Sequence, residues 1–202
     1  MHDSIQQGLQ TLASHNVAAR DALIVCAAAV VYVMAAAWLV VIARRRAWLT
    51  LGAVVRLAAL GVLAYAASKV LTSVVADPRP YLVEHVRPLI PVARDNGFPS
   101  DHTLLAATLT ATLWWINRRA LAAFAIGTLL VMAGRLGIGA HHTIDVLGAV
   151  GIVVTAALVV AALSLPAAWD RPLLPPRWRG GSRPTDNRTP RSVDVTSLPD
   201  SV

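Results

Sequence analysis

The sequence predicts an all-α fold: an integral membrane helical bundle of about five transmembrane helices, preceded by an N-terminal amphipathic helix. The composition and the placement of the charges predict this class. Of the 202 residues, 56% are hydrophobic and only 14% are charged, and the mean hydropathy is +0.58. These values exclude a chain that is disordered over most of its length, and they are untypical of a water-soluble domain.

Five apolar stretches approach the length of about 20 residues that a helix needs to cross a bilayer. They run over residues 22–43, about 48–76, 102–116, 120–136 and 145–165. The third stretch is short, so we expect it to begin within the headgroup region. Arg56 and Lys69 lie toward the two ends of the second stretch, from where such long side chains can reach the membrane surface.

Arginine clusters at the ends of these stretches predict the orientation, because Lys and Arg accumulate on the cytoplasmic side of membrane helices. If Arg44–Arg46 lie inside, five crossings also place Arg118–Arg119 and the arginine-bearing tail inside. The N-terminus, the segment 77–101 and the turn 137–144 then lie outside. One orientation therefore satisfies every arginine cluster.

The chain divides into three predicted parts. Residues 1–20 carry apolar side chains at helical spacing between Ile5 and Leu12, and no basic region of a secretory signal precedes the first apolar run, so we expect an amphipathic helix on the membrane surface. Residues 21–168 form the membrane domain. Residues 169–202 are rich in Arg and Pro and are expected to be a disordered cytoplasmic tail.

The net charge of +7 does not predict a nucleic-acid partner, because the arginines form short clusters between apolar runs and not one basic face. The single cysteine, Cys26, lies inside an apolar run. We therefore expect neither a disulfide framework nor a cysteine-based metal site.

Ionisable residues concentrate in three places against this apolar background: 69–80, 99–102 and 135–145. The predicted orientation puts all three at the extracytoplasmic end of the bundle. Charged groups at membrane depth cost roughly 3 kcal/mol or more each unless they are paired or hydrated. Their clustering therefore predicts a functional site at this end.

The third cluster contains His141 and Asp145, which share a face if the fifth helix begins near them. A carboxylate bonded to one ring nitrogen fixes the histidine tautomer and makes the other nitrogen a better nucleophile. Two other interpretations stay open. The two adjacent histidines can be headgroup-region residues with Asp145 as a helix cap, or His141, His142 and Asp145 can be metal ligands.

The other two clusters suit an anion. Ser100 or Asp101 is expected to cap the third helix, whose free N–H groups bind anions, and His102 follows where it can protonate a leaving oxygen. Two prolines flank Arg79, and a guanidinium held in this way can bind a phosphate through two hydrogen bonds. A membrane-anchoring arginine is the alternative interpretation of Arg79.

Taken together, the motifs resemble the type-2 phosphatidic acid phosphatase superfamily, whose signature is K-x6-R-P, P-S-G-H and S-R-x5-H-x3-D. The resemblance covers roughly residues 50–165. It is carried by Arg79-Pro80, by Pro99-Ser100-Asp101-His102, and by Arg135 with His141 and Asp145 at the signature spacing. The sequence Pro-Ser-Asp-His-Thr after Phe98 is most similar to the branch that dephosphorylates undecaprenyl diphosphate in bacterial envelopes.

Three positions depart from the signature. Asp101 replaces the glycine of P-S-G-H, and Gly134 replaces the serine of S-R and so removes a hydroxyl donor. Lys69 precedes Arg79 by ten residues where the signature has seven, and Thr72 occupies the expected lysine position. About one helical turn separates the two positions, so a long side chain can still approach the site.

The resemblance implies a role for each matching residue. His141 would attack phosphorus and form a phosphohistidine, Asp145 would orient it, and His102 would act first as acid and then as base. The implied phosphate-binding residues are Arg79, Arg135, Ser100, Lys69 and Asp101. The resemblance implies no metal and no other cofactor.

The implied substrate is a lipid phosphate, with undecaprenyl diphosphate expected first. Hydrolysis to undecaprenyl phosphate and phosphate would occur at the extracytoplasmic face of the bacterial cytoplasmic membrane. The expected partners are this lipid and the bilayer, with no nucleic acid, and the sequence predicts no oligomeric state.

Other functions remain open at the level of the sequence. The same chemistry fits phosphatidylglycerophosphate, phosphatidate or lipid A phosphate. A transporter or channel would use Arg56, Lys69 and Arg135 to line an ion path, although neither inverted repeats nor broken midplane helices are visible. An inactive scaffold is a third possibility. Vanadate-dependent haloperoxidases share the anion site of the superfamily, but five apolar stretches argue against that soluble class.

Overall fold

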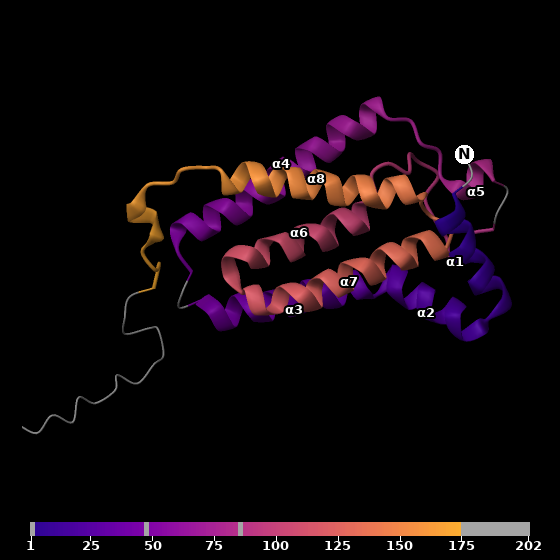
Figure 1. Ribbon diagram of the computed structural model, residues 1–202, viewed down its shortest axis with the longest axis horizontal. Helices are drawn as coiled ribbons and strands as arrows, with labels where there is room; N and C mark the ends of the chain where they lie inside the picture. Colours follow the sequence, from indigo (N-terminus) through magenta and orange to yellow (C-terminus); the bar gives the residue numbers. More distant parts are fainter. Residues whose placement is uncertain (1–2, 47–48, 85–86, 175–202) are drawn as a thin grey trace, which may run out of the picture.

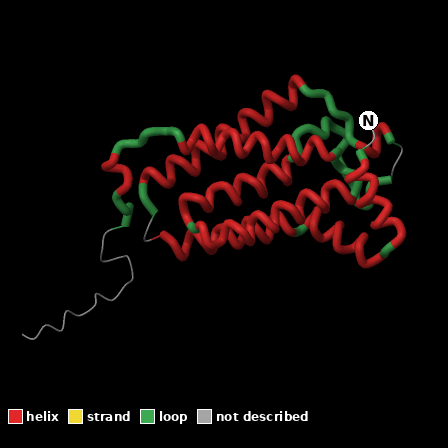
Figure 2. The backbone as a smooth tube through the Cα atoms, viewed as in Figure 1, coloured by secondary structure: helices red, strands yellow, loops and turns green. Residues whose placement is uncertain are grey.

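The structure, a computed structural model, describes residues 3–46, 49–84 and 87–174. Over these ranges it consists of helices, loops and two isolated β-bridges. The long helices run side by side along the long axis of the molecule (Figure 1), and a dense group of loops lies at the end where the chain begins (Figure 2). The predicted all-α class is confirmed.

The helices are, in chain order, α1 (Ser4–His15), α2 (Val17–Ala28), α3 (Val30–Arg45), α4 (Leu51–Val74), α5 (Pro80–Val83), α6 (Asp101–Ile116), α7 (Arg118–Gly137), α8 (Thr143–Ala161) and the 3-10 helix η2 (Ala167–Asp170). Three of them begin at polar caps. The side chains of Asp3, Asn16 and Thr50 each accept a hydrogen bond from a backbone N–H in the first turn that follows.

In the described part of the chain, three helices are long and apolar enough to cross a membrane: α4, α7 and α8. The pair α2 and α3 counts as a fourth span if it crosses as one unit, although it is bent by 48°. Helix α6, with 16 residues, falls short by this measure. These values support a helical membrane protein, and the number of five spans stays a prediction.

The apolar stretch 22–43 is not one straight helix, because the chain bends at Ala29 between α2 and α3. Two residues before the break, the backbone of α2 packs directly against Gly134 of α7. A Cβ at Gly134 would lie only 2.4 Å from the backbone nitrogen of Ala27. A hydropathy pattern contains no sign of such a contact, because every residue on both sides of the bend is apolar.

Helix α6 is the centre of the bundle despite its length, because it is buried on two sides. One core cluster joins it to α4 and α8, and includes Leu60, Leu104, Ala107, Ile152 and Val153. A second joins it to α3 and α7, and includes Val31, Met34, Leu109, Leu113 and Phe124. The first residues of α6 are therefore held firmly at the end of the bundle where the loops gather.

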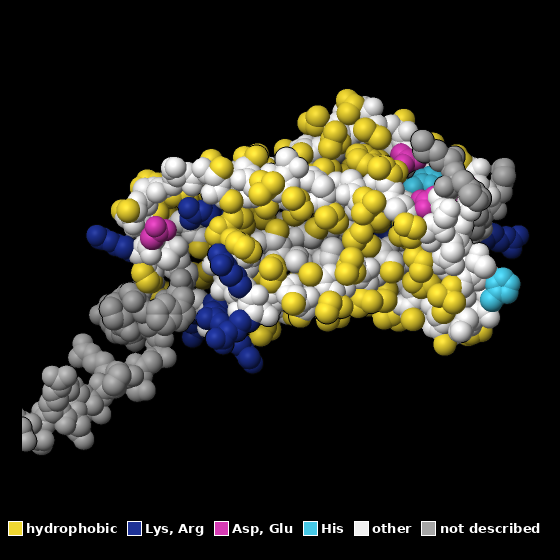
Figure 3. All heavy atoms as spheres, viewed as in Figure 1, with side chains coloured by type: hydrophobic (Ala, Val, Ile, Leu, Met, Phe, Trp, Pro, Cys, Tyr) yellow, Lys and Arg dark blue, Asp and Glu magenta, His cyan; other side chains and the backbone are white. Residues whose placement is uncertain are grey.

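The two ends of the bundle differ in charge. Arg44 and Arg45 end α3, and Arg118 and Arg119 begin α7. Figure 3 shows most of the visible Lys and Arg side chains at this end, histidines with acidic and a few basic side chains at the opposite end, and hydrophobic side chains over the flank between them. An apolar belt between two polar ends is the surface of a membrane protein.

Helix α1 lies at the end opposite the arginine clusters (Figure 1). Its apolar Ile5 and Leu12 are 60% and 50% exposed, whereas Gln6 and Ala13 are buried. An outward apolar face is what a helix lying in the membrane surface requires. Most of the predicted tail, 175–202, lies outside the described residues. The segment before it returns to the start of α4, where the N–H of Leu173 donates to the carbonyl of Leu49 (2.9 Å).

Candidate active site

The end of the bundle that carries α1 and α5 brings together residues from four parts of the chain. Arg79 precedes α5, Ser100 caps α6, Arg135 lies in the last turn of α7, and His141 and Asp145 flank the start of α8. All five were predicted from the sequence, and all five side chains are buried. The three sequence clusters therefore meet at one place.

His141 lies at the centre of this group. Its Nδ1 lies 2.9 Å from the carbonyl oxygen of Gly97 and 3.3 Å from Oδ2 of Asp145. Since both oxygens are acceptors at neutral pH, Nδ1 carries the proton. Its Nε2 then holds a free lone pair, 3.1 Å from Nη1 of Arg79 and 3.3 Å from Nη2 of Arg135. This is the tautomer that a nucleophilic Nε2 requires.

The surroundings of His141 favour its neutral form. Burial lowers the pKa of His141 well below its ordinary value, and the positive charges of Arg135 and Arg79 lower this pKa further. The hydrogen bond to the Gly97 carbonyl opposes the shift but does not cancel it. The ring is therefore unprotonated at neutral pH.

The two guanidiniums are held at the site in different ways. Arg79 donates from Nε to Oδ1 of Asp95 (2.7 Å) and from Nη1 to the carbonyl of Ala140 (3.1 Å), so its position is fixed on two sides. The buried Nε of Arg135 has no hydrogen-bond partner among the described residues. Two buried cations beside one neutral histidine, with a donor left unused, suit an anionic group such as a phosphate.

A polar turn at Asn96 and Gly97, which was not predicted from the sequence as part of the site, lies directly beside His141. The Nδ2 of Asn96 donates to the carbonyls of Thr72 (3.0 Å) and Val75 (2.6 Å), and its Oδ1 accepts from the N–H of Asp77 (2.9 Å). Asn96 thus ties the end of α4 to Gly97 beside it. The sequence Asp-Asn-Gly signals a turn, but nothing in it reveals that the Gly97 carbonyl reaches His141.

Asp145 has two roles that the sequence analysis treated as alternatives. Its Oδ2 faces Nδ1 of His141 and also accepts from the backbone N–H of His142 (2.9 Å), as a helix-capping carboxylate does. One side chain therefore caps α8 and faces the histidine. The start of α8 and the orientation of His141 are linked through it.

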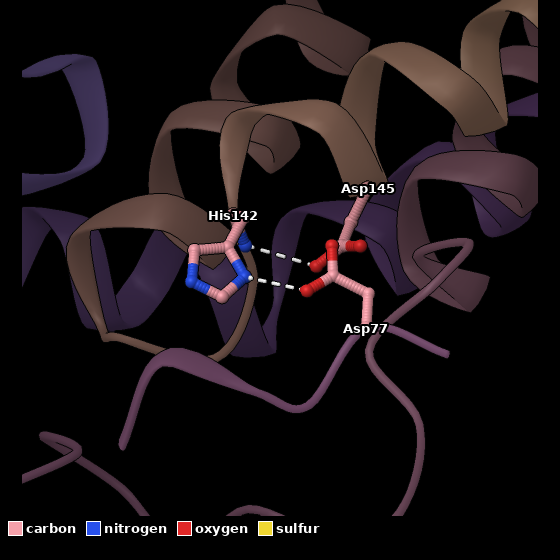
Figure 4. A group of neighbouring side chains, drawn as sticks. All are labelled: Asp77, His142 and Asp145. Atoms are coloured by element: carbon pink, nitrogen blue, oxygen red, sulfur yellow. Dashed lines mark hydrogen bonds and ion pairs between the residues drawn. The ribbon is translucent and has the colours of Figure 1, made fainter. Parts of the chain in front are cut away.

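A second group of titratable side chains adjoins the site (Figure 4). Nδ1 of His142 lies 3.2 Å from Oδ1 of Asp77. Its Nε2 lies 3.7 Å from Oε1 of Glu84, which Figure 4 does not draw. Burial raises the pKa of Asp77, and the charge of Asp145 raises it further. Asp77, His142 and Asp145 can each offer one metal-ligating atom, with these atoms within 4.8 Å of one another. The ion pairs of His142 and the cap formed by Asp145 account for the same arrangement without an ion.

The remaining predicted site residues differ in how near they come to His141. Ser100 is fully buried, and its Oγ accepts from Oγ1 of Thr103 (3.2 Å), which leaves the Ser100 hydroxyl proton free to donate. His102 is half-buried, and its charge interacts with those of Arg135, Arg79 and His141. His102 therefore lies near Arg79 and Arg135.

Lys69 and Asp101 are less closely tied to the site, although the charge of Asp101 interacts with those of Arg135 and His102. Both are exposed and line a cavity of about 380 Å³ between α4 and α6. The Nζ of Lys69 lies 5.2 Å above the ring of Tyr65, one turn earlier in α4. Within the described ranges, no hydrogen bond or ion pair joins either residue to the histidine, and their role in phosphate binding stays a prediction.

The ion path considered from the sequence does not form in this arrangement. Arg56 lies beside Gly52 and Asp170 near the start of α4, whereas Lys69 is exposed near the end of the same helix. Arg135 is buried beside His141. The three cations therefore line no common route along the bundle.

Comparison with known proteins bears on the family. Residues 53–169, more than half of the chain, match the family model described as the PAP2 superfamily. The chain belongs to the PAP2 superfamily. Every predicted site residue of this PAP2 domain lies within the matched range. Helices α1, α2 and α3 lie outside it.

A curated relative agrees with this assignment. The chain is 36% identical to undecaprenyl-diphosphatase BcrC of Bacillus subtilis (strain 168) over 84 residues, which are 42% of this chain and 44% of the relative. The chain thus spans less than half of the length of the curated relative that it matches. No solved structure matches the chain.

The packing of α2 against α7 explains why Gly134 stands where the family signature has serine. A Cβ at this position would lie 2.4 Å from the backbone nitrogen of Ala27 and 2.7 Å from the backbone carbon of Cys26. Backbone atoms of a packed helix cannot move aside as a flexible side chain can. The close contact between α2 and α7 therefore excludes a serine side chain here.

Proposed function

We propose that this chain is a phosphatase of membrane lipid diphosphates, that undecaprenyl diphosphate is its substrate, and that His141 is the nucleophile. The observation that carries the proposal is the unprotonated Nε2 of His141 between Arg79 and Arg135. The similarity to the Bacillus protein named undecaprenyl-diphosphatase supports the choice of lipid. Membership of the PAP2 superfamily supports the chemistry.

In the first step, Nε2 of His141 attacks the terminal phosphorus of the lipid diphosphate. A P–N bond forms while the P–O bond to the lipid phosphate breaks. His102 gives its proton to the leaving oxygen. Arg79 and Arg135 stabilise the negative charge on the equatorial oxygens, together with the Ser100 hydroxyl and N–H groups at the start of α6. Asp145 and the Gly97 carbonyl hold the Nδ1 proton while the ring becomes positively charged.

In the second step, water attacks the phosphorus of phospho-His141. His102, now neutral, takes a proton from this water, the P–N bond breaks, and inorganic phosphate leaves. Both histidines return to their first protonation states. Phosphoryl transfer of this kind depends mainly on positioning and charge stabilisation, which two buried arginines can supply.

We further propose that the site faces the extracytoplasmic side of the bacterial cytoplasmic membrane. The arginine clusters end α3 and begin α7, at the opposite end of the bundle from the start of α8, which directly follows His141 and His142 (Figure 1). By the positive-inside rule, that arginine-rich end is cytoplasmic. The domain limits 1–20, 21–168 and 169–202 belong to the same proposal, with the catalytic residues all in the middle part.

The test is phosphate release by purified protein in detergent, with undecaprenyl diphosphate, phosphatidylglycerophosphate, phosphatidate and lipid A as parallel substrates. We expect the highest kcat/KM on undecaprenyl diphosphate. His141→Ala and His141→Gln should each lose at least about 10³-fold in kcat, because each removes the nucleophile. Asp145→Asn should keep a residual rate, about 10²- to 10⁴-fold below wild type, because the ring stays but loses its orientation.

Two controls separate chemistry from folding and from metal dependence. The melting temperature of His141→Gln should stay near that of wild type, since glutamine retains polar atoms in the buried position. EDTA should leave turnover nearly unchanged, because in the proposed mechanism two arginines stabilise the phosphate charge that other phosphatases stabilise with metal ions. Activity of a folded His141 variant within tenfold of wild type would remove His141 as the nucleophile. Loss of activity in EDTA that Mg²⁺ or Zn²⁺ restores would overturn the mechanism.

A further inference from the structure

We infer that Asp3 is a positioning residue for the reaction: it fastens α1 to the first turn of α8 and so holds the loop that carries His141. This inference rests on the proposed function. The Oδ2 of Asp3 accepts from the N–H of Thr143 (2.5 Å), and its Oδ1 accepts from the Thr143 hydroxyl (2.7 Å). Asp3 and Thr143 are 140 residues apart in the sequence. We call this pair of hydrogen bonds the Asp3 clasp.

The clasp joins two helix N-termini through one carboxylate. Asp3 also accepts from the N–H of Gln6 (3.1 Å), so it caps α1 while it binds the first residue of α8. Free N–H groups and a partial positive charge at both helix ends stabilise a carboxylate there. Partial burial alone would raise the pKa of Asp3, but the hydrogen bonds from Thr143 and Gln6 outweigh it and lower this pKa below its ordinary value. The clasp is therefore ionised at neutral pH.

The inward face of α1 extends from the clasp along the His141 loop. Asp3, Gln6, Gln10 and Ala13 recur at the spacing of one helix face, and Gln6 and Ala13 are buried. Gln10 lies against Gly139: its Nε2 would be 2.7 Å from a Cβ on that glycine, whose φ of +76° is in the left-handed region. Thus α1 contacts the loop at residue 139 and again at residue 143, on either side of His141.

This position makes α1 a support of the nucleophile. His141 depends on Asp145 for its orientation, and Asp145 occupies the first turn of α8, the turn to which Asp3 is bonded. The side-chain amide of Gln6 is fully buried, and its nitrogen and oxygen have no hydrogen-bond partner within the described chain. Both atoms are therefore available for a further hydrogen bond. If the clasp opens, the start of α8 loses a cap and the loop loses its outer support.

The test compares Asp3→Ala, Asp3→Asn and Thr143→Val with the conservative Thr143→Ser, which keeps the hydroxyl. Asp21→Ala is the matched control, because Asp21 is an exposed aspartate on the neighbouring helix α2. With the lipid diphosphate as substrate, we expect Asp3→Ala to lose at least tenfold in kcat while KM changes less than about threefold. Small displacements of a catalytic group have effects of this size. The kcat of Thr143→Ser and of Asp21→Ala should stay within twofold of wild type. The kcat of Asp3→Asn and of Thr143→Val should lie between those of wild type and Asp3→Ala.

A second readout does not depend on the proposed function. Amide hydrogen exchange, followed by mass spectrometry, should become at least tenfold faster in Asp3→Ala over residues 139–146 but not in the middle of α6. If exchange is faster in Asp3→Ala but the wild-type protein does not hydrolyse the lipid diphosphate, the proposed function is contradicted and the Asp3 clasp is still supported. If Asp3→Ala has the same exchange rates and the same kcat as wild type, the inference that Asp3 positions the His141 loop is wrong. A loss of kcat and melting temperature in Thr143→Ser as large as in Asp3→Ala would also overturn it, since the hydroxyl would then be irrelevant.

Discussion

At the residue scale, the orientation of His141 depends on a backbone carbonyl as much as on a carboxylate. The Gly97 oxygen is closer to Nδ1 than Asp145 is, at 2.9 Å against 3.3 Å. A carbonyl cannot be protonated near neutral pH, so this acceptor holds the tautomer at any pH that the protein tolerates. The carboxylate adds the negative charge that stabilises the ring once it becomes cationic.

Gly97→Ala tests this arrangement. A Cβ on Gly97 would lie 2.9 Å from Oδ2 of Asp145 and 3.0 Å from the carbonyl of Asp77, so the turn or the carboxylate must shift. We expect kcat to fall by about 10²-fold, because displacements of about 1 Å can have that effect. Gly61→Ala in α4 is the control, since nothing lies within 4 Å of its added Cβ. A folded Gly97→Ala protein with wild-type kcat would show that the Gly97 carbonyl is not needed.

The pH dependence of kcat/KM tests the charge state of His141. Because burial and the two guanidiniums lower its pKa, the ring gains a proton only well below pH 6.5. Activity should therefore persist at a pH where an ordinary histidine, with a pKa of about 6.5, is half protonated. Removing one charge in Arg79→Gln should move the acidic limb of the profile toward higher pH and lower the maximum. An acidic limb at pH 6.5 or above in wild type would contradict this picture.

At the element scale, the structure explains which parts of the site could be predicted. Arg135, His141 and Asp145 are close in the sequence, so the short turn between α7 and α8 keeps them near one another. The pairing of Arg79 with Asp95 and of His141 with Gly97 depends on how the loop 87–100 folds over the bundle. Neither pairing follows from periodicity. Asp3 is bonded to a residue 140 positions away, and no local pattern signals that contact.

The contact between α2 and α7 yields a prediction about stability. Gly134→Ala would place a Cβ 2.4 Å from the backbone nitrogen of Ala27, and overpacking of this kind costs about 1–3 kcal/mol. Gly151→Ala in α8 is the matched control, because nothing lies within 4 Å of its Cβ and alanine favours a helix by up to about 1 kcal/mol. In the same detergent, the melting temperature should fall for Gly134→Ala and stay or rise for Gly151→Ala. Equal melting temperatures would show that the two helices are less closely packed.

At the scale of the whole molecule, the arginine clusters of α3 and α7 and the candidate active site occupy opposite ends of one apolar bundle. The composition predicted the membrane class, and the arginine clusters predicted which ends of the helices share a side. The number of spans was less predictable, because α6 is short and is stabilised by core contacts on two sides. Hydropathy reports how readily a segment transfers into lipid. It therefore does not identify a short helix such as α6, which is stabilised mainly by contacts with other helices.

The orientation of the molecule can be measured with single cysteines in a Cys26→Ser background. Ser14 and Arg94 are exposed at the end that carries His141, and Ser182 lies in the predicted cytoplasmic tail. A membrane-impermeant maleimide applied to intact bacteria should label cysteines at positions 14 and 94 but not at 182, because the positive-inside rule puts the arginine-rich end in the cytoplasm. In permeabilised cells, all three should react, which controls for accessibility. Labelling at 182 alone in intact cells would place His141 on the cytoplasmic side, and the substrate would then have to be a lipid phosphate of the inner leaflet.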